Sequence, residues 1–316
     1  MMPRIVVTRR IHPDALDALK AHGEVILWDE DRPIPAPTLR TWLRDADACL
    51  SMLTDRFGEE ELHETGPLKV ISNMAVGFDN IDVAAASRYG VIVTNTPDVL
   101  TEATAELTWA LMLALMRNLV PARDALLAGD WRDWKPDGFL GAELFGKTLG
   151  IVGWGRIGRA VARRAHAFGM DVIALRRPKS PHQDVRRLPL KSFLAQADVV
   201  SLHLPLTPET HGLIDARWFH DMKPGAFFIN TARGPLVDEA ALKNALDAGK
   251  IQGAALDVFS EEPVSGGHPL AAHPRVLATP HIGSATRETR RAMALRAAQN
   301  IMAVLKGETP PDWVNR

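Results

Sequence analysis

Two repeating patterns of apolar positions run along the chain. In the first hundred residues, short apolar runs typical of buried strands alternate with stretches whose apolar residues recur every three or four positions, as in helices. Strands that alternate with helices in this way predict a parallel sheet covered on both faces. The predicted strands are Ile5–Thr8, Val25–Trp28, Ala48–Met52, Val70–Ser72 and Val91–Thr94, and two of the helices between them are Pro13–His22 and Ile81–Tyr89.

A second series of the same kind begins at Thr148, so two α/β domains are predicted. We expect a discontinuous first domain of residues 1–99 and 285–316, to which the C-terminal helix Arg287–Leu305 returns, and a second domain of residues 100–284. The strands predicted in the second series are Leu149–Gly153, Val172–Leu175, Val199–Leu202, Ala226–Asn230, Ala254–Val258 and Val276–Thr279, with helices that include Ile157–Phe168 and Glu239–Ala248.

One long helix, Thr101–Leu119, is predicted between the two series. Thr101 can cap its N-terminus, and Glu102 and Glu106 complement the positive end of its dipole. From Leu107 to Met116 the helix is apolar on almost every side. Such a helix must be buried on most faces, so we expect it to pack between domains or against a second subunit. The Trp-rich stretch that follows it, residues 130–146, is predicted to be a loop.

Composition narrows the classes of protein. Hydrophobic residues make up 46 % of the 316 residues and charged residues 24 %, the balance of a soluble globular protein. A formal net charge of −1 gives no positive field for nucleic acid or an anionic membrane. The single cysteine, Cys49, can form no intrachain disulfide and no structural zinc site, so a reducing compartment is permitted and we expect no metal. No apolar run has the length of a signal peptide core at the N-terminus or of a membrane span elsewhere, so we expect the protein in the cytoplasm.

The strongest local signal is G-W-G-R-I-G, which lies between a predicted strand and a predicted helix. Gly153 permits a tight turn, Gly155 lets the backbone approach a pyrophosphate, and Gly158 lets the helix pack closely on the strand. The start of the helix then offers N–H donors and partial positive charge to the phosphates. A glycine-rich turn without a ligand is the alternative. We expect dinucleotide binding by Gly153, Trp154, Gly155, Arg156, Ile157 and Gly158.

The end of the next strand distinguishes NAD from NADP. NAD-binding proteins carry an acidic residue there, which bonds the ribose 2′-hydroxyl. Here the strand runs into Arg176 and Arg177 instead. Arginine offers a 2′-phosphate charge and several donors, so we expect NADP(H), with Arg176 as the main contact. The alternative is that both arginines are solvated surface residues.

Three residues in the second half of the chain have the types that reduction of a 2-keto acid requires. The reaction needs a cation for the carboxylate, a general acid for the carbonyl oxygen, and a partner that keeps this acid protonated. Arg233, Glu262 and His281 each lie close behind a predicted strand. In an open α/β sheet, this is where ligands bind.

These segments, INTARGPLVDE, AALDVFSEEP and LATPHIGSAT, together with GWGRIG, resemble the D-2-hydroxyacid dehydrogenase family over essentially the whole chain. Within the family, NMAVGFDNID (73–82), NTPDVLTEATAEL (95–107) and KGETPPDWVNR (306–316) are most similar to glyoxylate/hydroxypyruvate reductases. The resemblance implies two doubly wound parallel-sheet domains, a flavodoxin-like substrate domain and a Rossmann nucleotide-binding domain, with a cleft between them. It also implies a homodimer.

The resemblance implies a role for each site residue. Arg233 would pair with the substrate carboxylate, His281 would donate the proton during reduction, and Glu262, rather than its neighbour Glu261, would hydrogen-bond His281. A neighbouring carboxylate favours the protonated form of a histidine. The other histidines, such as His203 and His268, are expected to be structural.

Further binding residues follow from the same resemblance. The loop after the strand Val70–Ser72 would present the N–H groups of Val76 and Gly77 to the substrate carboxylate, and Asp257 would receive the nicotinamide amide. The other residues expected to contact the cofactor are Thr104, Leu204, Pro205, Thr231, Ala232, His281 and Gly283.

Other functions remain open at this point. Gly138 stands where glyoxylate/hydroxypyruvate reductases carry a tryptophan that reaches the partner's active site, so longer 2-keto acids such as 2-ketogluconate are an alternative substrate class. Formate dehydrogenases carry a glutamine in place of Glu262, which argues against that activity, whereas the triad alone leaves phosphite oxidation open. The non-enzyme alternative is a nucleotide-sensing module related to transcriptional corepressors.

Overall fold

The computed structural model describes residues 2–63, 65–176 and 184–316. The chain divides into two compact units, Met1–Leu100 with Ser284–Arg316, and Thr101–Gly283. The predicted class, two α/β domains built on parallel sheets, is confirmed, since every strand pair in both sheets is parallel. Among the described residues, no helix is both long enough and apolar enough to cross a membrane.

The first unit is a five-stranded sheet with the order β2-β1-β3-β4-β5. This is the flavodoxin-like order, in which the chain switches direction beside the first strand. The strands are β1 (Arg4–Val7), β2 (Glu24–Leu27), β3 (Ala48–Ser51), β4 (Val70–Asn73) and β5 (Ile92–Thr94). The helices are α1 (Pro13–Lys20), α2 (Ala36–Leu43), α3 (Glu59–His63), α4 (Val83–Arg88) and α11 (Arg287–Leu305).

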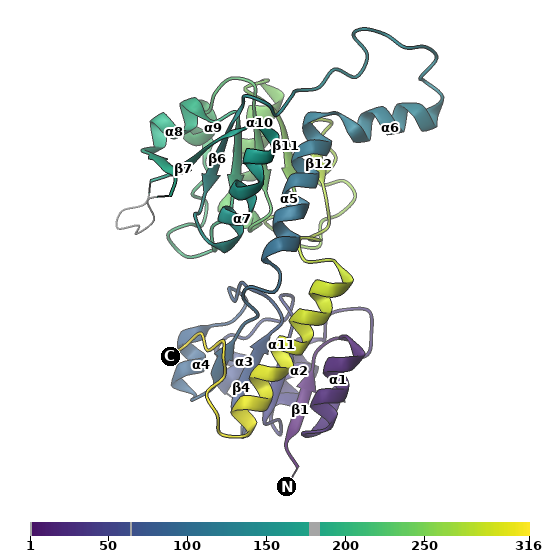
Figure 1. Ribbon diagram of the computed structural model, residues 1–316. Coiled ribbons are helices and arrows are strands. Elements are labelled where there is room, and N and C mark those ends of the chain that lie inside the picture. Colours follow the sequence, from purple (N-terminus) through teal and green to yellow (C-terminus); the bar gives the residue numbers. More distant parts are fainter. Residues whose placement is uncertain (1, 64, 177–183) are drawn as a thin grey trace. The chain divides into compact units, whose positions relative to one another are not determined.

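The C-terminal helix α11 belongs to this first unit. It packs against α1, β3 and β4, and it lies beside α1 in Figure 1. Its buried residues, which include Met293, Ala297 and Ile301, recur every four positions and so form one face. Ser72 of β4 donates a hydrogen bond from its hydroxyl to the carbonyl of Ala297, at 3.0 Å.

The second unit is a seven-stranded sheet with the order β12-β11-β10-β9-β6-β7-β8, which contains the Rossmann arrangement around β6. The strands are β6 (Thr148–Val152), β7 (Asp171–Leu175), β8 (Arg186–Leu188), β9 (Val199–Leu202), β10 (Ala226–Asn230), β11 (Ile251–Leu256) and β12 (Val276–Ala278). The helices are α5 (Thr101–Met116), α6 (Leu119–Ala128), α7 (Arg156–Ala165), α8 (Leu190–Gln196), α9 (Ala216–Asp221) and α10 (Glu239–Asp247), with short 3₁₀ turns at His166–Phe168 and Gly234–Leu236.

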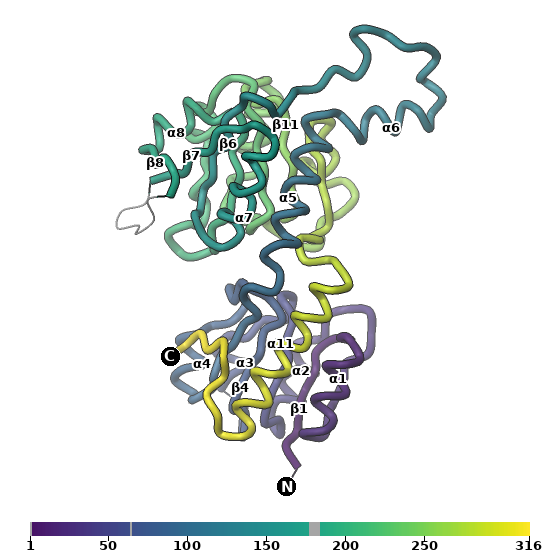
Figure 2. The backbone as a smooth tube through the Cα atoms, in the orientation of Figure 1, coloured from purple at the N-terminus to yellow at the C-terminus, as the bar shows by residue number. Residues whose placement is uncertain are grey.

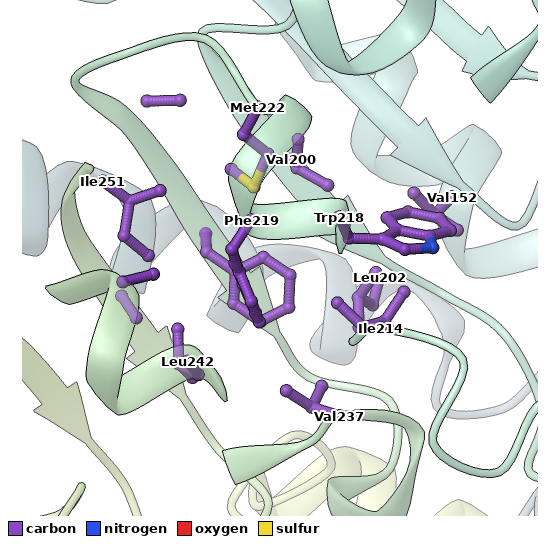
Figure 3. Packing of buried hydrophobic residues seen from close by; sticks show 14 of the residues in the cluster. Val152, Val200, Leu202, Ile214, Trp218, Phe219, Met222, Val237, Leu242 and Ile251 are labelled. Carbon is purple, nitrogen blue, oxygen red and sulfur yellow. The ribbon is translucent and has the colours of Figure 1, made fainter. Parts of the chain in front are cut away.

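Alternate residues of the central strands enter two separate cores, one on each face of this sheet. In β10, Phe227 and Ile229 pack with α5 and α7, whereas Phe228 packs with α8, α9 and α10. Trp218 and Phe219 of α9 project into the second of these cores (Figure 3). Because both faces are covered, the strands are apolar without strict alternation of polar residues.

The helix predicted over Thr101–Leu119 ends earlier than expected, at Met116. Asn118 adopts a left-handed backbone (φ +51°) that a continuous helix does not allow, and a separate helix, α6, starts at Leu119. The first of these helices, α5, is buried against α7 and the sheet of its own unit. Figure 2 shows α6 and the loop of residues 130–146 extending away from that sheet before the chain returns to β6.

Candidate active site

The glycine loop has the geometry that a dinucleotide-binding turn requires. Gly153 follows β6 with φ +104°, and a Cβ on it would lie 2.4 Å from the carbonyl oxygen of His203. A Cβ on Gly158 would lie 2.1 Å from the carbonyl oxygen of Gly153, so only glycine allows this close packing of helix on strand. On Gly155, by contrast, a Cβ would meet nothing within 4 Å, which leaves the backbone open on that side.

The other residues of this loop support the start of α7. Ile157 packs on the core shared with α5, and the guanidinium of Arg159 reaches the carbonyl of Trp154 at 3.5 Å. The Trp154 indole donates to Oδ1 of Asp184 at 3.1 Å. Arg156 is the first residue of the helix. The loop therefore presents the N-terminus of a ten-residue helix beside an open backbone, an arrangement suited to a phosphate.

Arg176 lies directly beyond the end of β7 and is exposed. Its backbone N–H donates to the carbonyl of Leu188, which ties this position to β8. Arg177, the second arginine of the cofactor prediction, lies outside the described residues. The carboxylate of Asp184, which accepts the hydrogen bond from the Trp154 indole, lies close to the glycine loop.

His203 lies just beyond the end of the neighbouring strand β9 and is half-buried. Burial lowers the pKa of its imidazole to about 3, so it is neutral at physiological pH. Its Nε2 lies 3.0 Å from the Ser201 hydroxyl, and its backbone N–H donates to the carbonyl of Val152. The next two residues, Leu204 and Pro205, continue the chain along the same edge of the sheet, where the Thr210 hydroxyl donates to the Pro205 carbonyl at 2.8 Å.

The structure brings Glu262 and His281 together. Glu262 Oε2 lies 2.7 Å from His281 Nδ1, and its Oε1 accepts the backbone N–H of Phe259 at 2.9 Å. The two side chains are 34 % and 31 % exposed, so solvent and ligand can both reach them. Burial raises the pKa of Glu262, but the hydrogen bond and charge of His281 outweigh it, and the net pKa is lowered.

Arg233 lies close to this pair because the turn that carries it packs against the turn that carries Glu262. A Cβ on Gly234 would lie 1.9 Å from the carbonyl carbon of Phe259, so the two backbones are in direct contact. The positive charge of Arg233 contributes to the lowered pKa of Glu262. Asn230 shapes the turn, since its amide donates to the Arg233 carbonyl and accepts the Ala232 N–H.

Asp257 holds the loop on which His281 lies. Its Oδ1 accepts the Thr279 hydroxyl at 2.7 Å and the Ile282 N–H at 2.8 Å, and its Oδ2 accepts the Gly283 N–H at 2.8 Å. Burial raises the pKa of Asp257, while these bonds lower it. The loop needs such support because His281 itself has a left-handed backbone (φ +53°).

Thr104 and Thr231 lie where α5 contacts the loops after β10 and β12. A Cβ on Gly283 would lie 3.6 Å from the Thr104 side chain, and the Thr231 hydroxyl lies 2.9 Å from that of Thr108. Val76 and Gly77 lie in the first unit, half-buried in the loop that follows β4.

Sequence reasoning missed several residues that position the site. Asn230, Thr279 and Glu239 are the clearest, since Glu239 accepts the Ser260 N–H at 2.7 Å and pairs with His268 at 3.2 Å. All three act on loops that meet only in the folded unit. The polar Asn230 at the end of an otherwise apolar strand was the one available signal.

A Rossmann sheet, a phosphate turn, and a histidine–carboxylate pair beside an arginine define a nucleotide-dependent dehydrogenase. The family model described as "D-isomer specific 2-hydroxyacid dehydrogenase, NAD binding domain" matches residues 109–283. The chain therefore belongs to the D-isomer specific 2-hydroxyacid dehydrogenase family, an assignment that the resemblance in the sequence predicted. The second unit is its NAD(P)-binding domain.

Full-length relatives support this assignment. A glyoxylate reductase from Aeropyrum pernix is 47 % identical, in an alignment that covers 99 % of this chain and 96 % of the relative. The crystal structure of a protein from Thermus thermophilus is similar with a TM-score of 0.93, at 46 % identity over 98 % of this chain and 99 % of that one. An NADPH-dependent glyoxylate/hydroxypyruvate reductase from Sinorhizobium meliloti, in complex with NADP and malonate, has a TM-score of 0.89 at 32 % identity, over 99 % and 97 % of the two chains.

Proposed function

We propose that the chain is an NADPH-dependent reductase that converts glyoxylate or hydroxypyruvate to the corresponding D-2-hydroxy acid. The observation that carries the proposal is the hydrogen-bonded pair of His281 and Glu262, with Arg233 beside it, in the same unit as the phosphate turn. The names of the relatives from Aeropyrum pernix and Sinorhizobium meliloti support the substrate class.

Each residue of the triad has one task in this proposal. The Arg233 guanidinium binds the substrate carboxylate, together with the N–H groups of Val76 and Gly77. Because His281 Nδ1 faces Glu262, Nε2 is the nitrogen that donates a proton to the carbonyl oxygen. Ionised Glu262 stabilises the imidazolium and fixes the orientation of the ring.

The cofactor is assigned to the turn at Gly153–Gly158, with Arg176 at the 2′-phosphate. The open side of Gly155 fits the approach of a pyrophosphate, and exposed Arg176 fits the added phosphate of NADPH. Thr104, Leu204, Pro205, Thr231, Ala232, Asp257 and Gly283 are proposed as further contacts, and Arg177 stays a prediction. Bound NADPH supplies the hydride for the carbonyl carbon.

The test is a comparison of kcat/KM for glyoxylate, hydroxypyruvate and 2-ketogluconate, each with NADPH and with NADH, in wild type and in Arg176→Asp. We expect NADPH with glyoxylate or hydroxypyruvate to be preferred in wild type. The variant should lose this preference by roughly tenfold or more, since an acid repels the 2′-phosphate. An unchanged ratio of NADPH to NADH would show that Arg176 has no part in selection.

Two alternatives have their own outcomes in this assay. Preference for 2-ketogluconate would follow from Gly138, which leaves out a large side chain in the loop of residues 130–146. Tight NADPH binding without turnover of any 2-keto acid would favour the nucleotide-sensing module.

The assembly and location proposed are a homodimer in the cytoplasm. Exposed apolar side chains on α6 and the following loop support the dimer. The buried free thiol of Cys49 is compatible with a reducing compartment.

A further inference from the structure

The loop that follows β4 has three consecutive carbonyl groups held by hydrogen bonds. The Thr96 N–H donates to the Ala75 carbonyl at 2.8 Å, and the Asn95 side-chain amide donates to the Val76 carbonyl at 2.8 Å. The Asn73 amide donates to the Gly77 carbonyl at 2.9 Å. Each carbonyl therefore has a fixed direction, set by donors at the ends of β4 and β5.

Fixing a carbonyl also fixes the next N–H group. A trans peptide is planar, so its C=O and N–H point in opposite directions. The bonds to Asn73, Asn95 and Thr96 thus set the N–H groups of Val76, Gly77 and Phe78. Two neighbouring donors, Asn95 and Thr96, hold adjacent carbonyls, so the first two of these N–H groups both face away from the end of β5.

These three N–H groups are available to a ligand. Across residues 2–63, 65–176 and 184–316, none of them donates to a protein acceptor. Val76 and Gly77 are half-buried and Phe78 is 38 % exposed. Successive N–H groups without a protein partner form a binding site for an anion.

We propose that Asn95 and Asn73 are positioning residues that aim the N–H groups of Val76, Gly77 and Phe78 at the substrate carboxylate. The inference rests on the proposed function, in which this loop binds the carboxylate, and it adds Phe78 as a third donor. The asparagines touch no substrate themselves; they preorganise the backbone donors that do.

The two asparagines are themselves held in place. Asn73 is completely buried, and its Oδ1 accepts the Ser51 hydroxyl at 3.1 Å while Nδ2 also reaches Asn80 at 3.0 Å. The Asn95 carbonyl accepts from Asn300 of α11 at 3.2 Å. An amide is needed at both positions because an ionised aspartate has no hydrogen to donate to a carbonyl.

The test uses Asn95, which is only half-buried, and measures steady-state kinetics with glyoxylate and NADPH. We expect Asn95→Ala to raise KM for glyoxylate roughly tenfold while kcat changes much less. The reason is that the substrate carboxylate loses preorganised N–H donors equally in the ground state and in the transition state. The Kd for NADPH, which binds the other unit, should stay at the wild-type value. Should Asn95→Ala be unstable, the isosteric Asn95→Asp is judged by the same criterion.

Asn315→Ala is the matched control. Asn315 also donates from its amide to a carbonyl of the first unit, that of Val91 at 2.9 Å, but beyond the opposite end of β5. We expect it to lower the melting temperature without changing KM for glyoxylate. A wild-type KM in folded Asn95→Ala or Asn95→Asp would overturn the inference and leave the proposed function intact. Wild-type protein that binds NADPH but reduces no 2-keto acid would overturn both.

Discussion

His281 owes its position to groups that lie far from it in the sequence. Glu262 bonds its ring and Asp257 bonds the loop on either side of it, where the backbone is left-handed. The two acids differ in environment, since the pKa of Glu262 is lowered and that of Asp257 is raised. Glu262 is therefore ionised at neutral pH and can act on the charge of the imidazole.

Replacing Glu262 with Gln should change the pH dependence of reduction. Its folded-state pKa lies below the usual value, so the carboxylate is charged throughout the neutral range and favours protonated His281. The amide keeps the shape but removes the charge. We expect kcat/KM to fall, with a larger loss at about pH 8 than at about pH 6.

Glu261→Gln is the control for this change, because the neighbouring glutamate has the same charge and is exposed. It should keep the wild-type profile. A Glu262→Gln profile that falls at the wild-type pH would mean that the carboxylate does not act on the proton donor.

Arg233, Glu262 and His281 could be selected as candidates from the sequence because each lies a few residues beyond a strand, where a parallel sheet places its ligands. Glu262 was chosen over Glu261 only by resemblance. The structure gives the physical difference, since Glu262 bonds both His281 and the Phe259 N–H. Asn73 and Asn95 could not be predicted, because their role depends on which strand ends are neighbours.

In both sheets an aspartate just before a central strand bonds the first residue of the neighbouring strand. Asp47, before β3, accepts hydrogen bonds from the Arg4 N–H at the start of β1 and from the Lys69 ammonium. Asp198, before β9, accepts hydrogen bonds from the Thr148 N–H at the start of β6 and from the Lys223 ammonium. Burial raises both pKa values, but the bonds outweigh it and both are lowered. Each carboxylate thus connects two adjacent central strands of its sheet.

Asp198→Asn should lower stability in a pH-dependent way. The folded pKa of Asp198 is below the unfolded value of 3.8, so its stabilisation is fully present above that value and is lost as the pH falls through the folded pKa. We expect the melting temperature to drop by roughly 2–4 °C near neutral pH, with a smaller difference from wild type below the unfolded pKa. Thermal unfolding followed by circular dichroism at both pH values measures this.

Asp171→Asn gives the comparison within the same sheet, since Asp171 is an exposed residue at the start of β7. It should change the melting temperature little at either pH. An equal loss in Asp198→Asn at neutral and at acidic pH would contradict the assignment of the effect to charge.

At the element scale, strongly patterned segments were predicted closely, and α11 agrees at both ends. The break at Asn118 and the strand β8 (Arg186–Leu188) were not predicted. Pro121, three residues beyond Asn118, was the one local signal of that break, and β8 is a short edge strand of mostly polar residues. In both cases, tertiary context overrides a weak local signal.

At the scale of the whole molecule, the two strand orders explain why two series of alternating strand and helix patterns predicted the fold class correctly. Each series is a doubly wound sheet with its own core, so hydrophobic periodicity alone describes it. Periodicity gives no account of α6, which has apolar residues but no buried ones within the described chain.

The exposed apolar arm, defined here as α6 with residues 129–146, therefore bears on assembly. Its exposed side chains include Leu126, Leu127, Trp131, Trp134, Leu140 and Phe145, and Phe145 is 79 % exposed. Exposing this many large apolar side chains to water is unfavourable for a monomer and favours an interface between two copies. Wild-type protein should accordingly sediment with the mass of a dimer. The double variant Leu127→Glu with Leu140→Glu should be monomeric, because an interface does not accommodate two unpaired buried charges.

The control is Leu190→Glu, which replaces an exposed leucine at the start of α8, outside the arm, and should stay dimeric. A wild-type monomer in sedimentation velocity would contradict the proposed homodimer, whereas a dimer that survives both arm substitutions would move the interface to another surface.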